Sequence, residues 1–270
     1  MVNIKFIGAN SDDVGANVYG ARKIKKTKKE EKMTEVEKRI DINKNMLCPG
    51  CGHMIAMRLI TEVLDEKKLC DKTIICLDVA CCSLLIEFVY YDTLMAAHGR
   101  VLPTSTGTKS VRPENIVLSY MGDGAAYSIG LNETMHSAIR NENIFAVVIN
   151  NGLFAMTGGQ ASPTTLIGQK TPTTIYGKDE KKSGKPFLIE DALSGLDIGF
   201  LARASLSTKD DIDFAKKMLS ESLDNYLSKK GFCMVELLSP CPTNLHLSPA
   251  DANKRIKDEV EKIYKVGRFK

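Results

Sequence analysis

The sequence contains no tryptophan, and aromatic residues make up only 6% of its 270 positions. It also lacks an uninterrupted apolar run of the roughly 18 residues that a membrane-spanning helix requires. The N-terminus, MVNIKFIGANSDD, has no apolar stretch of the kind found in a secretory signal peptide. We therefore expect a cytoplasmic protein with no membrane partner. Apolar residues still make up 43% of the chain, which is enough to bury a substantial core.

An excess of basic residues is confined to the N-terminal segment. Residues 1–33 carry eight basic and four acidic side chains, whereas the remaining 237 residues carry 29 of each. The run KIKKTKKEEK, which begins at Lys23, could contact RNA or a membrane surface. No aromatic residues interleave with its lysines, as they do in segments that bind single-stranded nucleic acid. We therefore predict a basic, flexible tail over 1–33, a single domain over 34–270, and no nucleic-acid partner.

Strand-like and helix-like apolar patterns alternate from residue 34 onward. Buried-strand candidates occur at 73–79, 116–121, 144–150, 200–206 and 232–239. Helical spacing of apolar residues occurs at 54–68, 126–141 and 211–230. This alternation predicts an α/β fold with a parallel sheet and helices on both faces. A Gly-, Thr- and Pro-rich connection, 157–186, interrupts the pattern, and because long ordered loops are usually functional we expect 157–166 to belong to a site.

Polar residues follow two of the predicted strands. Gly122-Asp123-Gly124 ends one strand, and Asn150-Asn151 ends the next, 27 residues after Asp123. Glycines let the backbone approach a phosphate closely, and the N-terminus of a following helix favours negative charge. Carboxylate and amide oxygens suit Mg²⁺, and the carbonyl of Leu153 could add a third ligand. The alternative is an ordinary GDG turn and an unrelated pair of asparagines.

Eight cysteines without an export signal indicate a reducing compartment. There, clustered cysteines more often bind metal or perform redox chemistry than form structural disulfides. Cys48 and Cys51 form a C-x-x-C, but Gly52 separates them from His53, so the stretch is not a haem-attachment motif. A thioredoxin-like pair and a zinc site of four thiolates remain open. Buried free cysteine is common, and we assign Cys70, Cys76 and Cys233 to the core.

The GDG motif followed by NN resembles the diphosphate-binding motif of thiamine diphosphate enzymes. That resemblance implies the diphosphate-binding fold of this class and a magnesium ion held by Asp123, Asn151 and the carbonyl of Leu153. Further segments are similar to the β subunits of 2-oxoacid:ferredoxin oxidoreductases over about residues 45–250. They are CPGCGH (48–53), HGR (98–100), LPTSTGTK (102–109), MTGGQASPTT (156–165) and SPCPTN (239–244).

The family resemblance implies a [4Fe–4S] cluster close to the thiamine cofactor. Cys48, Cys51 and Cys241 match three of its cysteine ligands, and thiolates are the usual ligands of such clusters. The fourth lies in VACCS, where the family has one cysteine after a G-I-G-like triplet. Aligning V-A with I-G selects Cys81, with Cys82 as the alternative.

The same resemblance implies the remaining site and the reaction. The expected cofactor-binding residues are Gly122, Asp123, Gly124, Asn150, Asn151, Leu153 and Thr157. His98 and Arg100 are the expected catalytic residues. Relatives often have a second Asp after GDG, whereas Ala125 follows here, so the diphosphate contacts could differ locally.

The implied activity is CoA-dependent oxidative decarboxylation of a 2-oxoacid to acyl-CoA and CO₂, with reduction of ferredoxin. CPGCGH and MTGGQ are closer to the 2-oxoisovalerate and 2-oxoglutarate types than to the pyruvate type. The implied partners are an α subunit that supplies the pyrimidine-side Glu, and γ and ferredoxin-like δ subunits or domains. Two alternatives are a thiamine diphosphate-dependent decarboxylase without a cluster and a nonenzymatic metal-binding or electron-transfer scaffold.

Overall fold

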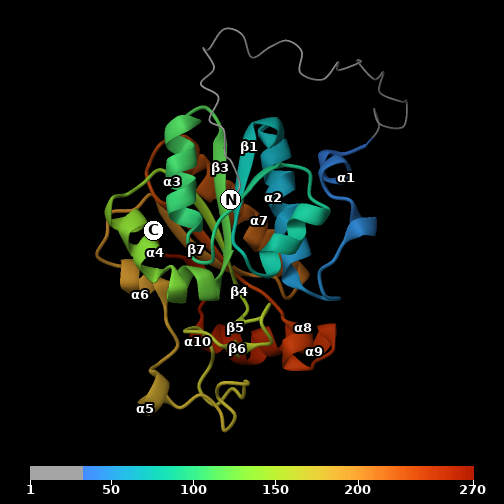
Figure 1. Cartoon of the computed structure of the whole chain (residues 1–270), viewed down its shortest axis with the longest axis vertical. Helices are drawn as coiled ribbons and strands as arrows, with labels where there is room; N and C mark the ends of the chain where they lie inside the picture. Colours follow the sequence, from blue (N-terminus) through green and yellow to red (C-terminus); the bar gives the residue numbers. More distant parts are fainter. Residues whose placement is uncertain (1–32) are drawn as a thin grey trace, which may run out of the picture. The chain divides into compact units, whose positions relative to one another are not determined.

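The computed structural model describes residues 33–270, whose backbone alternates between strands and helices (Figure 1). All of the predicted tail except Met33 lies outside the described residues. The strands are Thr73–Leu77 (β1), Asp92–Met95 (β2), Ile116–Gly122 (β3), Phe145–Asn150 (β4), Leu153–Phe154 (β5), Gln160–Ala161 (β6), Phe200–Ser205 (β7), Cys233–Leu238 (β8) and Gly267–Arg268 (β9). The α-helices are Glu35–Arg39 (α1), Gly52–Glu66 (α2), Val101–Val111 (α3), Leu131–Ile139 (α4), Glu180–Ser183 (α5), Ile189–Leu193 (α6), Lys209–Leu227 (α7), Pro242–Leu245 (α8), Pro249–Arg255 (α9) and Glu261–Ile263 (α10).

One seven-stranded sheet organises the described residues, in the order β2-β1-β3-β4-β8-β7-β9. Every pairing in this sheet is parallel except that of β7 with β9. Strands β5 and β6 form a separate antiparallel pair. The predicted α/β fold is therefore confirmed, with each of the five predicted strands present within about two residues of its expected ends.

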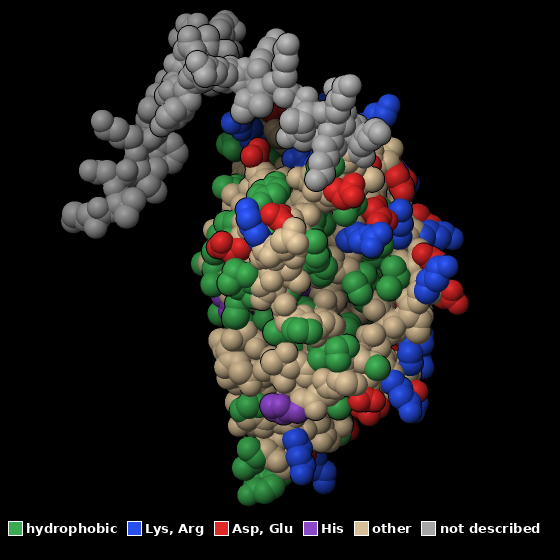
Figure 2. Space-filling model, turned by 90° about the vertical axis from the view of Figure 1, so that its right-hand side faces the viewer, with side chains coloured by type: hydrophobic (Ala, Val, Ile, Leu, Met, Phe, Trp, Pro, Cys, Tyr) green, Lys and Arg blue, Asp and Glu red, His purple; other side chains and the backbone are tan. Residues whose placement is uncertain are grey.

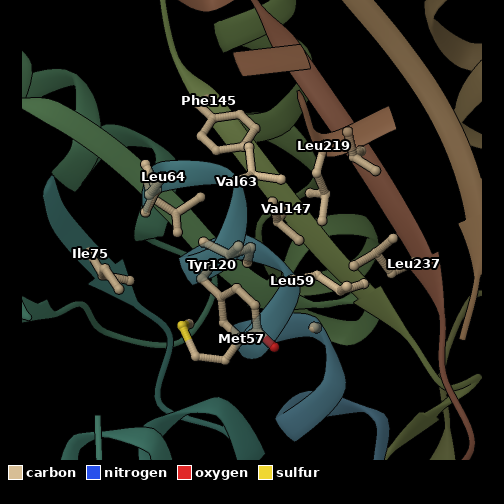
Figure 3. Close-up of a cluster of buried hydrophobic side chains, with 14 of the residues drawn as sticks. Met57, Leu59, Val63, Leu64, Ile75, Tyr120, Phe145, Val147, Leu219 and Leu237 are labelled. Atoms are coloured by element: carbon tan, nitrogen blue, oxygen red, sulfur yellow. The ribbon is translucent and has the colours of Figure 1, made fainter. Parts of the chain in front are cut away.

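Alternate side chains of the central strands enter two separate cores. In β4, Phe145, Val147 and Ile149 pack with α2 and α7 on one face. Figure 3 shows Phe145 and Val147 gathered with Val63 of α2 and Leu219 of α7. Ala146 and Val148 point to the opposite face, where they share a core with residues of α3 and α4. Successive side chains of β4 thus point to opposite faces of the sheet and both faces are buried, which explains why the sequence of β4 is a continuous apolar run.

Helix α3 was not predicted, because its sequence, VLPTSTGTKSV, is poor in strong helix formers. Its hydroxyl side chains bond back to the helix's own carbonyls. Thr104, Thr106, Thr108 and Ser110 each donate to the carbonyl four residues earlier, at 2.8–3.1 Å. Val101 and Leu102 are buried in the core beside the sheet. Tertiary burial therefore sustains a helix that propensity alone does not favour.

The helix expected over 126–141 begins with an irregular turn. A π-turn spans Ala125–Ile129, and α4 starts only at Leu131. Gly130 lies at the junction, where a Cβ would overlap the backbone oxygens of Gly99 and Ala125. The close crossing of these two backbones accounts for the break in the helix.

The strand ends that matter for function lie at one edge of the sheet. Because β1, β3, β4 and β8 are parallel, the residues after them emerge on the same side. In Figure 1 the short elements β5, β6, α8 and α9 lie below the sheet at this edge. Residues Glu35–Lys270 form one compact unit.

Charged side chains of both signs are mixed on the face shown in Figure 2, along one side of the molecule. This fits the equal numbers of basic and acidic residues after position 33. None of the helices within 33–270 combines the length and apolar character needed to cross a membrane.

Candidate cofactor site

A cavity of about 260 Å³ opens at the carboxyl edge of the sheet. Its walls come from the segments that follow β1, β3 and β4 and from the turn after β5. The lining residues are His53, Val79, Ala80, Cys81, Cys82, His98, Gly122, Asp123, Gly124, Ala125, Asn151, Leu153, Phe154, Ala155, Met156 and Thr157. Most of the predicted cofactor-binding residues therefore share one cavity.

Asp123 is the buried acid of this cavity. Its Oδ2 accepts hydrogen bonds from Ser162 Oγ, at 2.7 Å, and from Thr164 Oγ1. Burial raises the pKa of the Asp123 carboxyl to about 6, against the opposing effect of these hydrogen bonds and of the Asn151 amide. No lysine or arginine is among the residues that line the described cavity. A bound cation would supply the positive charge that this lining lacks.

The two adjacent asparagines have different positions. Asn151 and Leu153 line the cavity, and the Oδ1 of Asn151 accepts a hydrogen bond from the Leu153 amide at 3.1 Å. Asn150 is buried outside the lining, where its Nδ2 donates to Glu236 Oε1 at 2.8 Å. The Oδ1 of Asn150 accepts from the Gly152 amide at 3.1 Å. Asn150 thus shapes the turn after β4, while Asn151 faces the cavity.

The second glycine of the GDG motif, Gly124, occupies a position with no room for a side chain. A Cβ on Gly124 would overlap the ring of Phe154, whereas Gly122 has only the Ile149 carbonyl within 4 Å, at 3.9 Å. Thr157 lines the same cavity, and its hydroxyl donates to Gln160 Oε1 at 2.6 Å. The segment 157–166 therefore touches the cavity at one end through Thr157 and holds Asp123 from the other through Ser162 and Thr164.

Four of the cysteines come together from three distant segments. Cys48 and Cys51 flank a turn in which the Cys51 amide donates to the Cys48 carbonyl at 3.0 Å. This turn packs on the C-terminal segment, since a Cβ on Gly50 would lie 2.7 Å from Pro249 and 3.2 Å from Pro242. Burial raises the pKa of the Cys51 thiol to about 12, and the charges of Cys241, Cys81 and Cys48 add to that rise.

Cys81 and Cys82 lie in different surroundings. The charges of Cys241 and Cys48 help burial to raise the pKa of Cys81 to about 11. Cys82 is fully buried, and its thiol donates to the Asp78 carbonyl at 3.3 Å. Burial raises the pKa of the Cys82 thiol, and the charges of Asp78 and Cys81 add to that rise. Cys81 thus lies close enough to Cys48 and Cys241 for their charges to act on it.

The other cysteines lie in the core. Cys70, Cys76 and Cys233 are buried, as predicted. Among residues 33–270, no three His, Cys, Asp or Glu side chains are close enough to share a single metal ion.

His98 and Arg100 point in different directions. His98 lines the cavity, and its Nδ1 lies 2.7 Å from Asp78 Oδ2. Arg100 does not line the cavity; its guanidinium donates to the Ile129 carbonyl at 2.9 Å and pairs with Glu133 at 3.1 Å. Arg100 thus ties the loop before α3 to the segment around α4, and its catalytic role stays a prediction.

Several residues that hold the site were not predicted individually, although Ser162 and Thr164 lie in the segment 157–166 that was expected to belong to a site. Asp78 fixes His98, Ser162 and Thr164 hold Asp123, and Glu236 holds Asn150. Asp78 carried a usable signal, because it is an acidic residue at the end of a predicted buried strand. The others lie far along the chain from their partners, and their roles depend on the packing of the sheet.

Comparison with known proteins defines the family. The family profile for the C-terminal, TPP-binding domain of thiamine pyrophosphate enzymes matches residues 79–237, more than half of the chain. Subunit VorA of a ketoisovalerate oxidoreductase from Methanothermobacter marburgensis is 37% identical over 226 residues, which cover 83% of this chain and 47% of that protein. Subunit KorB of 2-oxoglutarate synthase from Archaeoglobus fulgidus is 31% identical over 211 residues, 78% of this chain and 75% of that one. The chain belongs to the 2-oxoacid:ferredoxin oxidoreductase family.

A solved structure supports this family membership. The 2-oxoglutarate:ferredoxin oxidoreductase from Magnetococcus marinus superposes with a TM-score of 0.67 at 27% identity, covering 78% of this chain and 69% of that one. The predicted resemblance and fold are therefore confirmed. This family member spans about half the length of the VorA subunits that it matches.

Proposed function

We propose that this chain is the subunit of a 2-oxoacid:ferredoxin oxidoreductase that binds both thiamine diphosphate with Mg²⁺ and a [4Fe–4S] cluster. The observation that carries the proposal is the position of Cys81. It lines the same cavity as Asp123 and Asn151, and it also lies among Cys48, Cys51 and Cys241. Cys81 would therefore lie between a cofactor bound in the cavity and a cluster bound by the four thiolates.

The residues around Asp123 fit a magnesium diphosphate. Asp123 would supply a carboxylate oxygen, Asn151 an amide oxygen and Leu153 its carbonyl, a set of hard oxygen ligands. Gly122 and Gly124 would let the backbone approach the phosphates, and Thr157 lies at the cavity wall. Bound thiamine diphosphate supplies a carbanion and an electron sink for decarboxylation of a 2-oxoacid. The protein orients it and holds its charge.

The four cysteines fit a cluster in charge and in place. Burial disfavours the thiolates of Cys51, Cys81 and Cys241 in the metal-free protein, and iron would compensate the negative charge that burial penalises. Asn244 donates an amide hydrogen to the Cys241 sulfur at 3.5 Å. Hydrogen bonds to the sulfur ligands are among the features that set a cluster's reduction potential. Electrons would leave toward ferredoxin through this side of the subunit.

The whole reaction needs partners. Glutamate is missing from the residues that line the described cavity, which supports an α subunit as the source of the pyrimidine-side Glu. We propose γ and ferredoxin-like δ subunits or domains as the remaining partners, with CoA and ferredoxin as co-substrates. The similar Magnetococcus marinus enzyme was solved with 2-oxoglutarate, coenzyme A and succinyl-CoA bound. The VorA relatives are named for ketoisovalerate, so both 2-oxoacids are the substrates to assay first.

The test is iron and sulfide content after purification without oxygen, with the visible spectrum before and after dithionite. We expect about four irons per chain and a brown colour that bleaches on reduction. Cys81→Ser and Cys241→Ser should each lose most of the iron. Cys76→Ser is the control, because Cys76 is buried against Thr108 in the other core and should keep its iron.

The outcomes also decide between the alternatives. If Cys82→Ser loses iron and Cys81→Ser keeps it, the ligand assignment is wrong although the cluster is present. A colourless wild-type protein that binds thiamine diphosphate would favour a decarboxylase without a cluster. A protein that binds neither iron nor thiamine diphosphate would favour a nonenzymatic scaffold.

A further inference from the structure

Asp78 holds the start of the HGR segment in place. It follows β1, its side chain is fully buried, and both of its carboxylate oxygens are used. Oδ2 lies 2.7 Å from the Nδ1 of His98, and Oδ1 accepts from the Gly99 amide at 2.8 Å. Because a carboxylate only accepts hydrogen bonds, the Nδ1 of His98 carries the hydrogen.

The rest of the His98 ring is available to the cavity. Its side chain is 32% exposed and lines the cavity wall, with its ring 6.1 Å from that of Phe154, edge to face. With Nδ1 engaged by Asp78, Nε2 is the nitrogen left for a bound molecule. Gly124 also lies close to the Phe154 ring, so this ring contacts both the GDG turn and His98.

The cavity has little positive charge of its own. None of its lining residues is a lysine or an arginine. The second histidine, His53, is buried, and its Nδ1 lies 2.9 Å from the hydroxyl of Tyr120. Among the described residues that line the cavity, His98 is therefore the one placed to present a positive charge to a bound ligand. Every molecule in the proposed reaction that would enter here is an anion.

We propose that protonated His98 donates its Nε2–H to an anionic oxygen of the molecule bound in this cavity, and that Asp78 is its positioning residue. The oxygen belongs either to the diphosphate of thiamine diphosphate or to the carboxylate of the 2-oxoacid, which present the same chemistry to an N–H donor. This inference rests on the proposed function. The buried carboxylate balances the charge of the imidazolium and fixes the orientation of the ring.

The test separates the two oxygens by two measurements on the anaerobically purified complex. Calorimetric titration with thiamine diphosphate and Mg²⁺ gives the Kd of the cofactor, and steady-state assays give KM and kcat for the 2-oxoacid. If His98 contacts the diphosphate, His98→Ala raises the cofactor Kd about tenfold or more and leaves KM within about twofold. If it contacts the substrate carboxylate, KM rises by that factor and the cofactor Kd does not.

Two further variants examine the donor and its positioning residue. His98→Gln keeps an N–H donor near the position of Nε2 and should recover part of the lost affinity. Asp78→Asn should shift the same constant as His98→Ala, in the same direction, because the neutral amide does not balance the imidazolium. His136→Gln is the control, since His136 is exposed on α4 and does not line the cavity.

The proposal is overturned if His98→Ala leaves both constants within about twofold of wild type. The positioning role is overturned if Asp78→Asn lowers only the midpoint of thermal unfolding and changes neither constant. Failure of the proposed function would look different, because the wild-type complex itself would then bind no thiamine diphosphate or turn over no 2-oxoacid.

Discussion

A single methyl group at position 124 would collide with the ring of Phe154. We predict that Gly124→Ala displaces this ring into the cavity and raises the Kd for thiamine diphosphate about tenfold or more, because overpacking a tight contact costs about 1–3 kcal/mol. Titration calorimetry measures the change.

Gly107→Ala is the control, because Gly107 is exposed on α3 with nothing within 4 Å of an added Cβ. It should leave the Kd unchanged and raise the free energy of unfolding by about 0.5–1 kcal/mol. Equal cofactor affinity in both variants would contradict this role of Gly124.

At this same scale, some site residues could be read from the sequence and others could not. Asp123, Asn151 and Leu153 stand in a short motif at the ends of neighbouring strands, so their shared cavity followed from the parallel sheet. Ser162 and Thr164 are about 40 residues from Asp123, and no local spacing links them to it. Arg100 sits in a family motif beside His98, yet its side chain points to Glu133. The side chains of residues that lie close together in the sequence, such as His98 and Arg100, can therefore point in different directions.

Among the elements, the CPGC turn before α2 depends on a glycine in the left-handed region. Gly50 has φ +78°, and an added Cβ would lie 2.7 Å from Pro249. We predict that Gly50→Ala lowers the free energy of unfolding by about 2–4 kcal/mol, from backbone strain and overpacking together. It should also lower iron content, because the turn carries Cys48 and Cys51. Chemical denaturation and iron analysis measure the two effects.

Gly184 provides a matched control for that substitution. It has φ +70°, but nothing lies within 4 Å of an added Cβ. Gly184→Ala should therefore show only the conformational cost, about 1–3 kcal/mol for its φ +70° and ψ 173°, with full iron content. If the two variants lose the same stability and keep the same iron, the packing of the CPGC turn on the C-terminal segment does not support the thiols.

The elements differ in how far their sequences predicted them. The five buried strands are short apolar runs of typical strand length, and α2 and α7 carry apolar residues at helical spacing. Strand β2, DTLM, is a short edge strand with exposed residues and no alternation to detect. Helix α3 contains few strong helix formers and depends on the burial of Val101 and Leu102 against the sheet. Apolar patterns therefore reveal strands that are buried on both faces and helices with an apolar stripe. They do not reveal elements such as β2 and α3, which tertiary contacts stabilise.

For the whole molecule, the cavity without a glutamate predicts dependence on a partner. We expect the isolated chain, loaded with thiamine diphosphate, Mg²⁺ and its cluster, to reduce a one-electron acceptor with a 2-oxoacid at least about a hundredfold more slowly than the complex, because a missing proton-transfer group costs that much. An anaerobic assay with methyl viologen, with and without the partner chain, measures the difference. The partner chain alone is the control. Turnover by the lone chain at the rate of the complex would contradict the partner's role.

The order of strands in the sheet also has a consequence for the sequence of events during biosynthesis. Strand β8 lies between β4 and β7, although it is made after both, and Cys241 follows it directly. Within the described sheet β7 pairs with β8 and β9, both of which are made after it, so β7 cannot join the sheet before β8 has been synthesised. Cys48, Cys51 and Cys81 are synthesised long before this point, and they would wait as free thiols. Iron delivery would then be a late step of maturation, performed on a nearly complete chain and sensitive to any truncation near its C-terminus.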